Sequence, residues 1–398
     1  MVSRASSLCG DDERVRIGLI GLGNMGSVHA RELRAGRVQR AELSAICDLV
    51  PAALDPFGGV PRFTEYPALL NSGLVDAVLI ATPHYDHTPI SIDALGQGLH
   101  VLCEKPLAVH KADCELMIEA YRRRPHADQV FAEMFNQRTD PRYQKLRALV
   151  QGGELGELQR INWIITDWFR SEAYYRAGGW RATWRGEGGG VLMNQCPHNL
   201  DLWQWMFGLP ERVRAFCGFG RFHEIEVEDQ VTAYFEYPNG ATGVFITSTG
   251  EAPGTNRLEV TGERGKVVVE GGGLSFTRNE VSTSEFSRST AERFAAPPVW
   301  NVQIPISGPG TQHLGILQNF VNAILDGEPL LAPASEGIHS VELANAMIYS
   351  ALQAETVTLP LDSSAYAAEL ERLIVDSRHE KPKANTLARD DFARSFGS

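Results

Sequence analysis

The 398-residue sequence has few cysteines and no long apolar segment, and these absences narrow the classes of protein to which it can belong. Its six cysteines are spread irregularly and include no C-x-x-C pair. Such spacing is typical of reduced thiols in the cytosol rather than of disulfides or a structural zinc site, and we expect no metal. No run of about 18 apolar residues predicts a transmembrane helix, and the first residues lack an apolar signal segment. We therefore expect a cytoplasmic protein.

Positive charge is also scarce. Acidic residues outnumber basic ones by 49 to 37, which gives a formal net charge of −12. Because contacts to nucleic-acid phosphates need a basic surface, we expect neither nucleic acid nor a membrane as a partner. The hydrophobic content of 43% and the charged content of 22% are ordinary for a globular protein. The chain is too long for one ordinary core, so two domains are expected.

The first third of the chain alternates β-rich runs with helical patterns. One run, DAVLIAT at 76–82, is apolar almost throughout, as in a strand that is buried on both faces of a sheet. Strands that alternate with helices predict a parallel sheet with right-handed crossovers. We therefore expect a doubly wound α/β domain of the Rossmann type over residues 13–135. Its expected strands are 15–21, 41–47, 76–82, 100–106 and 127–135.

From about Asn136 the pattern changes to long β-like runs. Asn239-Gly240 between two alternating runs is a strong hairpin signal, and 257–271 is a second expected hairpin. We expect an α+β domain over 136–377 with a large, mostly antiparallel open sheet. Helices are expected near 141–152, 311–326 and 335–354, and residues 378–398 are expected to form a polar tail.

A glycine turn follows the first expected strand and opens the first expected helix. Gly21, Gly23 and Gly26 have G-x-G-x-x-G spacing, which is weak alone but has the strand–turn–helix context that the motif requires. These glycines permit a tight turn, close approach of a pyrophosphate and close packing of helix on strand. The start of the helix at Asn24 and Met25 then offers free N–H groups to phosphate.

Asp48 ends the second expected strand. A carboxylate at this point can accept hydrogen bonds from both ribose hydroxyls of an adenosine and repels a 2′-phosphate. No Arg or Lys stands beside Asp48 to attract that phosphate. We therefore expect NAD rather than NADP as the cofactor, against the alternative that Asp48 is a turn or capping residue.

The stretch GGGVLMNQCPHNLDLWQW at 188–205 gathers three polar side chains among apolar ones. In one continuous helix, Asn194, His198 and Asp201 would share a face. Taken alone, the pattern also fits a polar stripe that faces water, or a core histidine bonded to its neighbours.

Several motifs together resemble the glucose–fructose oxidoreductase and inositol dehydrogenase family (Gfo/Idh/MocA). They begin with ATPHYDH at 81–87 and with Glu104-Lys105-Pro106 after an expected strand. GELGEL at 153–158, the glycine-rich stretch from Gly188 and YPNGATGVF at 237–245 are similar to that family too. Each motif is loose, but their order is specific, and the resemblance runs from about Val15 to about Leu361.

The resemblance implies a Rossmann domain followed by a domain whose open sheet forms subunit interfaces, in a homodimer or homotetramer. It implies oxidation of a sugar or cyclitol hydroxyl, or the reverse reduction, with NAD or NADP and no metal. The family lysine between nicotinamide and substrate corresponds to Lys105, and the acid/base histidine to His198. Two positions depart from the family: Asn194 replaces the Asp of inositol dehydrogenase-like members, and His84 replaces the usual Asn.

Four residues are the predicted catalytic group. Hydride transfer from a carbinol carbon needs a base for the hydroxyl proton, and His198 is the first candidate because the imidazole pKa lies near neutrality. Lys105 can stabilise the developing alkoxide, or can itself be the base if burial lowers its pKa. Asp201 could hold the imidazole tautomer, and Asn194 could hydrogen-bond a polyol.

Further residues are expected around the two ligands. Six of the seven tryptophans fall between Trp163 and Trp205, and the aromatic stretch 167–184 could line the substrate cleft and stack on sugar faces, or its rings could simply belong to the core and to interfaces. His87 has a structural alternative, and Glu104 could orient Lys105 or contact the nicotinamide ribose. The expected cofactor residues, besides the glycine turn, Asp48 and Lys105, are Thr82, Pro83, His84, His87 and Glu104. The expected substrate residues, besides Lys105, Asn194 and His198, are Tyr175, Arg181, Trp184 and Arg185.

We therefore expect an NAD-dependent dehydrogenase that acts on a secondary alcohol of a sugar, glycoside or cyclitol. Three alternatives remain open: a glycosidase that uses NAD for transient oxidation, a dihydrodiol-type dehydrogenase, and a non-catalytic NAD-binding sensor. The presence of both Lys105 and His198 argues against the sensor.

Overall fold

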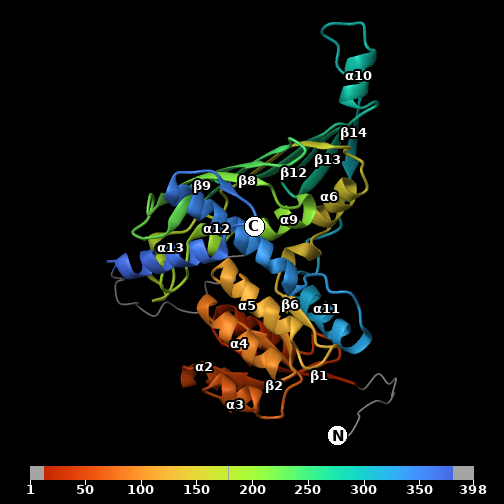
Figure 1. Ribbon diagram of the computed structural model, residues 1–398. Coiled ribbons are helices and arrows are strands. Elements are labelled where there is room, and N and C mark those ends of the chain that lie inside the picture. Colours follow the sequence, from red (N-terminus) through yellow and green to blue (C-terminus); the bar gives the residue numbers. More distant parts are fainter. Residues whose placement is uncertain (1–12, 178, 380–398) are drawn as a thin grey trace.

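The computed structural model describes residues 13–177 and 179–379, which form two β-sheets, one above the other, with helices between and around them (Figure 1). The elements of the first part are β1 (Val15–Ile20), α1 (Asn24–Arg34), β2 (Ala41–Cys47), α2 (Pro51–Leu54), η1 (Asp55–Phe57), β3 (Arg62–Phe63), α3 (Tyr66–Leu70), β4 (Ala77–Ile80), α4 (His84–Gly96), β5 (His100–Cys103), α5 (Lys111–Arg122) and β6 (Phe131–Glu133).

The first sheet has six parallel strands in the order β3-β2-β1-β4-β5-β6, which confirms the expected doubly wound domain. All four residues of β4 are buried, as the apolar run predicts. The connections change direction between β1 and β4, so the loops that follow these strands leave a crevice at the carboxyl edge of the sheet. The glycine turn and the Glu104-Lys105-Pro106 segment both lie at this edge.

The elements of the second part are η2 (Asn136–Thr139), α6 (Pro141–Gln151), β7 (Leu158–Ile165), α7 (Glu172–Arg176), α8 (Val191–Asn194), α9 (Pro197–Phe207), β8 (Arg212–Phe219), β9 (Glu228–Glu236), β10 (Thr242–Ser248), β11 (Asn256–Gly262), β12 (Gly265–Glu270), β13 (Gly273–Asn279), α10 (Thr283–Ser289), β14 (Val299–Ile304), α11 (Gln312–Asp326), α12 (Ala334–Gln353), β15 (Val357–Thr358) and α13 (Ser363–Asp376).

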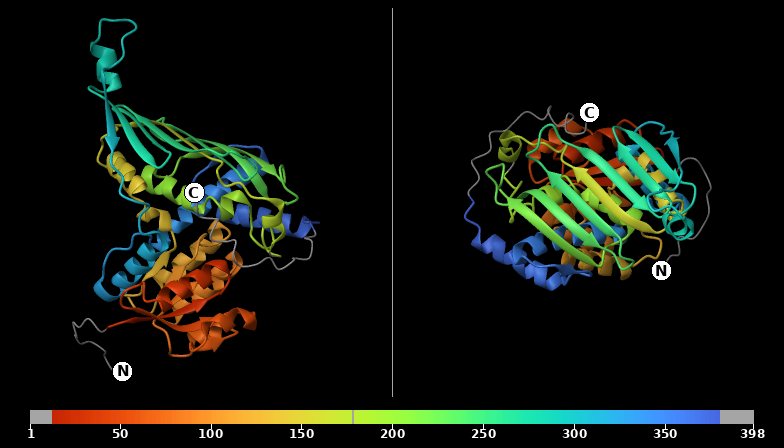
Figure 2. Two further views of the ribbon diagram at one scale, coloured as in Figure 1. Left: turned by 180° about the vertical axis from the view of Figure 1, so that it is seen from behind. Right: turned by 90° about the horizontal axis from the view of Figure 1, so that it is seen from above.

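The second sheet has nine strands in the order β14-β13-β12-β11-β7-β10-β9-β8-β15 and is antiparallel except for the pair β7–β10. Both expected hairpins are present, as β9–β10 around Asn239-Gly240 and as β11–β12. Helices α9 and α12 lie against the face toward the first sheet, whereas the outward face carries no layer of helices (Figure 2). The expected open, mostly antiparallel sheet is thus confirmed.

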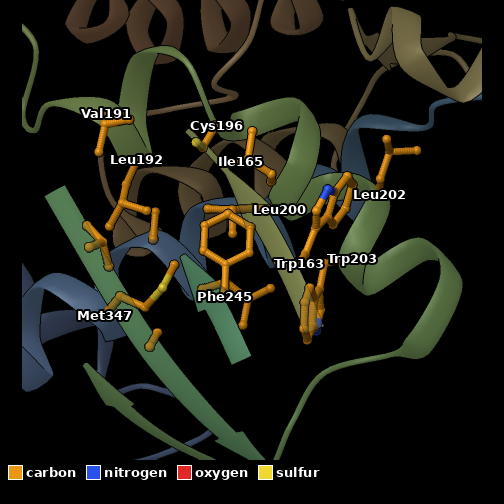
Figure 3. Packing of buried hydrophobic residues seen from close by; sticks show 14 of the residues in the cluster. Trp163, Ile165, Val191, Leu192, Cys196, Leu200, Leu202, Trp203, Phe245 and Met347 are labelled. Atoms are coloured by element: carbon orange, nitrogen blue, oxygen red, sulfur yellow. The ribbon is translucent and has the colours of Figure 1, made fainter. Parts of the chain in front are cut away.

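Aromatic and aliphatic side chains fill the space between the second sheet and its helices (Figure 3). Trp163 of β7 and Trp203 of α9 are fully buried there. The Trp203 ring meets Phe235 edge-on, with ring centroids 5.0 Å apart, and its indole nitrogen donates to the Tyr237 hydroxyl at 2.7 Å. These two tryptophans are core residues, which is the second of the two alternatives left open for the tryptophans.

Helix α11 packs with the first sheet although it lies far along the chain. Its residues Ile316, Leu317, Phe320 and Val321 share one buried cluster with residues of β1, β2 and β4. The sequence groups α11 with the domain 136–377, whereas its apolar side faces the domain 13–135. The chain therefore enters the second domain after β6 and returns to complete the first.

Some elements have no counterpart among the sequence predictions. The helix α13, the strands β13 and β14 and the projecting helix α10 are the main ones (Figure 1). Helix α10 has no buried residue, so its sequence lacks the apolar periodicity that predicts a helix. Of the predicted polar tail, only Arg378 and His379 lie within the described residues. In the described part of the chain, no helix has the length and apolar character that a membrane crossing needs.

Candidate active site at the carboxyl edge of the parallel sheet

The glycine turn between β1 and α1 has the geometry of a phosphate cradle. Gly21 has a φ of +91°, and a Cβ there would lie 2.6 Å from the Ala81 carbonyl oxygen. A Cβ on Gly26 would lie 1.8 Å from the Gly21 carbonyl oxygen, so helix and turn touch at this point. At Gly23, which caps α1, a Cβ would meet no protein atom within 4 Å. The open space at Gly23 and the uncapped start of α1 fit a dinucleotide pyrophosphate.

Asp48, directly after β2, supports this turn. Its Oδ2 accepts the Leu22 N–H at 2.7 Å, and its Oδ1 accepts the Val50 N–H at 2.8 Å. The side chain is therefore held beside the turn, at the position from which a carboxylate reaches the adenosine ribose in Rossmann domains. Asn24 is exposed and Met25 is half-buried at the start of α1, on the same side.

The loops after β4 and β5 are tied together by His87. Its two ring nitrogens face the carbonyl oxygens of Pro106 and Thr82, at 2.9 Å and 3.0 Å. The ring is fully buried, which supports the structural alternative for His87 over direct contact with a cofactor. Pro83 caps α4 and is exposed. His84 is buried, with Nδ1 3.3 Å from the Glu187 carbonyl oxygen and its ring against Trp180.

Lys105 joins the two domains. Its side chain crosses from the loop after β5 to the second domain, where Nζ donates to the Asn194 carbonyl at 2.8 Å. Burial lowers the pKa of the ammonium, and the Glu104 carboxylate opposes that effect. The guanidinium groups of Arg181 and Arg170 lower it further.

Glu104 forms a buried pair with His29 of α1. The distance from His29 Nε2 to Glu104 Oε1 is 2.7 Å, and the second oxygen, Oε2, accepts the Lys105 N–H at 3.2 Å. Burial acts to raise the pKa of Glu104, but His29, His313 and Lys105 together lower it to about 2. Glu104 is thus a carboxylate at neutral pH although it is buried.

His198 of α9 lies in the same region. The side chain is buried, and its ring meets that of Phe135 edge-on with centroids 6.1 Å apart. Within the described residues, its Nδ1 has no hydrogen-bond partner. Burial, with added effects from Lys105 and His313, holds the pKa of His198 well below its usual value. The imidazole is therefore neutral at pH 7 and can accept a proton.

The expected single helix through Asn194, His198 and Asp201 is wrong. Helix α8 ends at Asn194, and α9 begins at Pro197, which has no N–H to continue the hydrogen bonds of a helix. Because of this break, the Asn194 carbonyl can turn to Lys105 while its side-chain amide donates to Glu187.

The expectation that Asp201 orients the imidazole of His198 is also wrong. Asp201 accepts two hydrogen bonds from Arg138, at 2.8 Å from Nε and 2.5 Å from Nη2, and both side chains are about 1% exposed. Burial raises the pKa of Asp201, and Arg138 opposes the rise. Asp201 fixes α9 to the segment η2 and acts on the site only through that helix.

The second-domain loops add a polar cluster opposite Lys105. The Tyr174 hydroxyl accepts from Arg181 at 2.8 Å and donates to the Asn194 side-chain oxygen at 3.2 Å. The guanidinium of Arg181 lies 4.7 Å from the centre of the Trp180 ring. Glu187 completes the cluster by accepting from the Asn194 amide. Arg181 and Asn194 are thus brought together, as expected for substrate-binding residues.

Two other substrate expectations are corrected. Tyr175 is buried and bonds its hydroxyl to Thr249 at 2.7 Å, and Trp184 is buried against Phe219, so both belong to the core. Tyr174, one residue earlier, faces the polar cluster in place of Tyr175. Arg185 is exposed, and its role in substrate binding remains a prediction.

Sequence reasoning missed His29, His313, Tyr174 and Glu187. His29 follows Gly26 by one helical turn, and a histidine on the buried side of the phosphate-facing helix was the available signal. Tyr174 lies in α7, Glu187 in the loop before α8 and His313 at the start of α11, so long-range packing brings them to the site. Among the described residues, no group of three or more His, Cys, Asp or Glu could hold a metal ion.

Comparison with known proteins identifies the family. Residues 15–131 match the family model described as "Oxidoreductase family, NAD-binding Rossmann fold", and residues 143–268 match that of the GFO/IDH/MocA C-terminal domain. Inositol 2-dehydrogenase of Corynebacterium glutamicum is 30% identical over 200 residues, which are 49% of this chain and 54% of that protein. The alignment thus spans about half the length of this relative.

Two relatives match over longer stretches. Levoglucosan dehydrogenase of Pseudarthrobacter phenanthrenivorans is 24% identical over 87% of this chain and 99% of its own length. The structure of the WlbA dehydrogenase of Bordetella pertussis, solved with NADH and UDP-GlcNAcA, has a TM-score of 0.73 at 27% identity. It covers 88% of this chain and 100% of that one. With matches in both of its domains, the chain belongs to the Gfo/Idh/MocA family of oxidoreductases and carries that family's NAD-binding Rossmann domain.

Proposed function

We propose that the protein is an NAD-dependent dehydrogenase that oxidises a secondary alcohol of a sugar, glycoside or cyclitol, or catalyses the reverse reduction. The observation that carries the proposal is the approach of Lys105 to the second domain at the carboxyl edge of the parallel sheet, with the neutral His198 within electrostatic range. The inositol and levoglucosan dehydrogenases among its relatives support this substrate class.

The chain supplies groups that suit the cofactor. NAD, when bound, accepts the hydride. The turn at Gly21, Gly23 and Gly26 suits the pyrophosphate, and Asp48 suits the adenosine ribose. Glu104 adjoins Lys105 in the loop after β5, and His87 links that loop to the Thr82 carbonyl in the loop after β4.

His198 is the proposed base. As a neutral imidazole with an unpartnered Nδ1, it can take the hydroxyl proton of the substrate. Lys105, held as an ammonium beside Glu104, donates to the same oxygen and stabilises the alkoxide charge. Arg181, Tyr174 and Asn194 offer donors and acceptors to the remaining hydroxyl groups.

The test is NADH formation with a panel of sugars, cyclitols and glycosides, with the variants Lys105→Ala and His198→Ala beside the native protein. We expect turnover with one substrate class and a loss of about 10²- to 10⁴-fold in each variant. Lys266→Ala changes a half-buried lysine on β12, outside the proposed site, and serves as the matched control. Tight NAD binding without turnover on any substrate would contradict the dehydrogenase, and cleavage of a glycoside without NADH accumulation would favour the glycosidase.

We also propose that two or four chains associate through the open face of the nine-stranded sheet. Phe216 of β8 is 64% exposed and Tyr234 of β9 is 41% exposed. The register pairs Phe216 with Thr232 and Arg214 with Tyr234, so both aromatic rings lie on the uncovered face. Light scattering should report a dimer or tetramer for the native chain and dissociation for Phe216→Glu. A monomeric native chain would contradict the proposed association.

We also propose a cytoplasmic location, which cell fractionation tests.

A further inference from the structure

A buried imidazole–carboxylate pair lies beside Lys105, and its imidazole, His29, has no part in the mechanism above. The side chain of His29 is 0% exposed and that of Glu104 is 8% exposed, with 2.7 Å between Nε2 and Oε1. Since an ionised carboxylate only accepts hydrogen bonds, Nε2 carries the hydrogen. In the described residues, the other ring nitrogen of His29 finds no partner. The Glu104 contact is therefore the one hydrogen bond found for this ring.

The second Glu104 oxygen is aimed at Lys105. It accepts the backbone N–H of that residue at 3.2 Å, while Nζ of the same lysine reaches the uncharged Asn194 carbonyl. The carboxylate is thus anchored between α1 and the lysine, with no freedom to rotate away. It is the principal negative charge acting on the ammonium from the first domain.

The other charged and titratable groups around this pair lie on several elements, and Glu104 also acts on His87 of α4, Cys103 of β5 and Glu133 of β6. Arg170, Arg181 and Glu187 act on Lys105 from the second-domain loops. His198 of α9 and His84 of α4 feel the lysine charge. His313 of α11 has its ring centroid 5.7 Å from that of His29. Two arginines thus oppose Glu187, so Glu104 is needed to balance the charge around the lysine.

We propose that His29 is a positioning residue that keeps Glu104 ionised and thereby keeps Lys105 protonated while His198 accepts the substrate proton. The inference rests on the proposed function for the role of Lys105, but the pair itself can be tested without substrate. A buried carboxylate without its donor takes up a proton. If Glu104 became neutral, the buried ammonium would lose its counter-charge and would release its proton at a lower pH.

The first experiment measures the protonation of Lys105 directly in the NAD-free protein. Acetic anhydride acetylates only the neutral amine, so the labelling of Lys105, followed by mass spectrometry across pH, gives a midpoint. In His29→Leu we expect this midpoint to fall by about one pH unit or more. His29→Gln, which keeps a donor for Oε1, should restore most of the shift. Lys266 of β12, whose side chain is 44% exposed, is labelled in the same sample, and its midpoint should not change.

A double-mutant cycle tests the route of the effect. Glu104→Gln keeps the shape of the side chain but removes the charge, so it should shift the midpoint as much as His29→Leu does. In the Glu104→Gln background, His29→Leu should add no further shift, because its effect passes through the carboxylate. Once a substrate is known, the pH profile of kcat gives a further test. On the alkaline side of that profile, kcat of the same variants should fall at a lower pH than kcat of the native protein.

Two outcomes would overturn the inference. One is an unchanged Lys105 midpoint in both single variants, with only a lower melting temperature, which would make the pair structural. The other is a full additional shift from His29→Leu in the Glu104→Gln background. If His29→Leu does not fold, the Glu104→Gln variant alone tests the inference. An unshifted Lys105 midpoint in that variant would show that the Glu104 carboxylate does not keep Lys105 protonated. A shifted Lys105 midpoint in the variants, together with no turnover of any substrate by the native protein, would contradict the proposed function. It would still support the role of His29 and Glu104 in keeping Lys105 protonated.

Discussion

Two glycines of the same turn meet opposite demands. Gly26 touches protein backbone, whereas Gly23 faces space that no protein atom fills. The first is needed by the fold and the second by the ligand. A methyl group added at each position separates these two roles.

We expect Gly26→Ala to lower both the melting temperature and NAD affinity, because its Cβ would lie 1.8 Å from a carbonyl oxygen. Gly23→Ala should melt like the native protein but bind NAD at least about tenfold more weakly, since the methyl group enters the pyrophosphate space. Thermal melting and titration with NADH fluorescence measure the two effects. Native-like NAD binding by Gly23→Ala would contradict this account of the turn.

Single residues also show what the sequence could predict. Lys105, His198 and the glycine turn stand in recognisable sequence motifs and could be predicted. The structure then brings Lys105 into contact with the second domain. Tyr174 and Tyr175 are adjacent in α7 and chemically equal, so no local signal says which hydroxyl joins the polar cluster. The choice depends on a long-range partner, because the Tyr175 hydroxyl bonds Thr249, 74 residues away.

Among the elements, the turn before α8 depends on a buried carboxyl group. Glu228, the first residue of β9, accepts the N–H groups of Gly190 and Leu192 at 2.8 and 3.0 Å through one oxygen. Burial raises the pKa of Glu228 to about 7. Between its ordinary value of 4.5 and about 7, the folded protein holds a proton that the unfolded chain releases.

The free energy of unfolding therefore falls as pH rises through this window. We expect Glu228→Gln, which keeps the accepting oxygen and cannot ionise, to melt at a higher temperature than the native protein at pH 8 and to lose that advantage at pH 5. Glu292→Gln, at an exposed position, is the control and should change neither value. Equal pH dependence in Glu228→Gln and the native protein would show that this carboxyl group is not the cause.

The ion pair that holds α9 gives a second prediction at this scale. The buried Arg138 guanidinium pairs with two carboxylates, those of Asp201 and Glu336. Asp201→Asn removes the first of these charges and leaves only the second. Urea unfolding should show a loss of about 3–5 kcal/mol, as for other broken buried pairs. Asp376→Asn breaks the exposed pair with Arg372 and should cost far less. Similar losses in both variants would mean that the burial of Asp201 is unimportant.

The elements differ in how far the sequence determines them. The strands β2 and β4 and the hairpin at Asn239-Gly240 were predictable because period, apolar content and turn residues agree. The break between α8 and α9 was missed although Pro197 marks it, because the apolar pattern continues across the break. Helix α10 projects from the rest of the molecule and buries none of its residues, so its sequence has no apolar periodicity from which a helix could be predicted.

For the whole molecule, the main feature is the return of α11 to the first domain. The Rossmann core is incomplete without Ile316, Leu317, Phe320 and Val321, although residues 13–135 supply all six strands. Hydrophobic periodicity predicts that α11 has a buried face, but it does not say which sheet that face meets. The domain boundaries drawn from the sequence remain a prediction for this reason.

We expect a fragment of residues 13–135 to lack a cooperative melting transition and to bind a hydrophobic dye, because the surface covered by α11 is exposed to water. The full chain should melt cooperatively and bind no dye. Circular dichroism with dye fluorescence distinguishes the two. A sharp transition and NAD binding in the fragment would show that α11 contributes little to this core.

The same return also sets an order of events during synthesis. A ribosome that makes roughly 5–20 residues per second needs about 10–40 s to travel from the end of β6 to the last core residue of α11. During that interval the nascent first third of the chain carries an uncovered apolar surface while most of the second domain is still being made. The first domain therefore completes its core late in synthesis, and its dependence on chaperones should be greatest before the ribosome reaches α11.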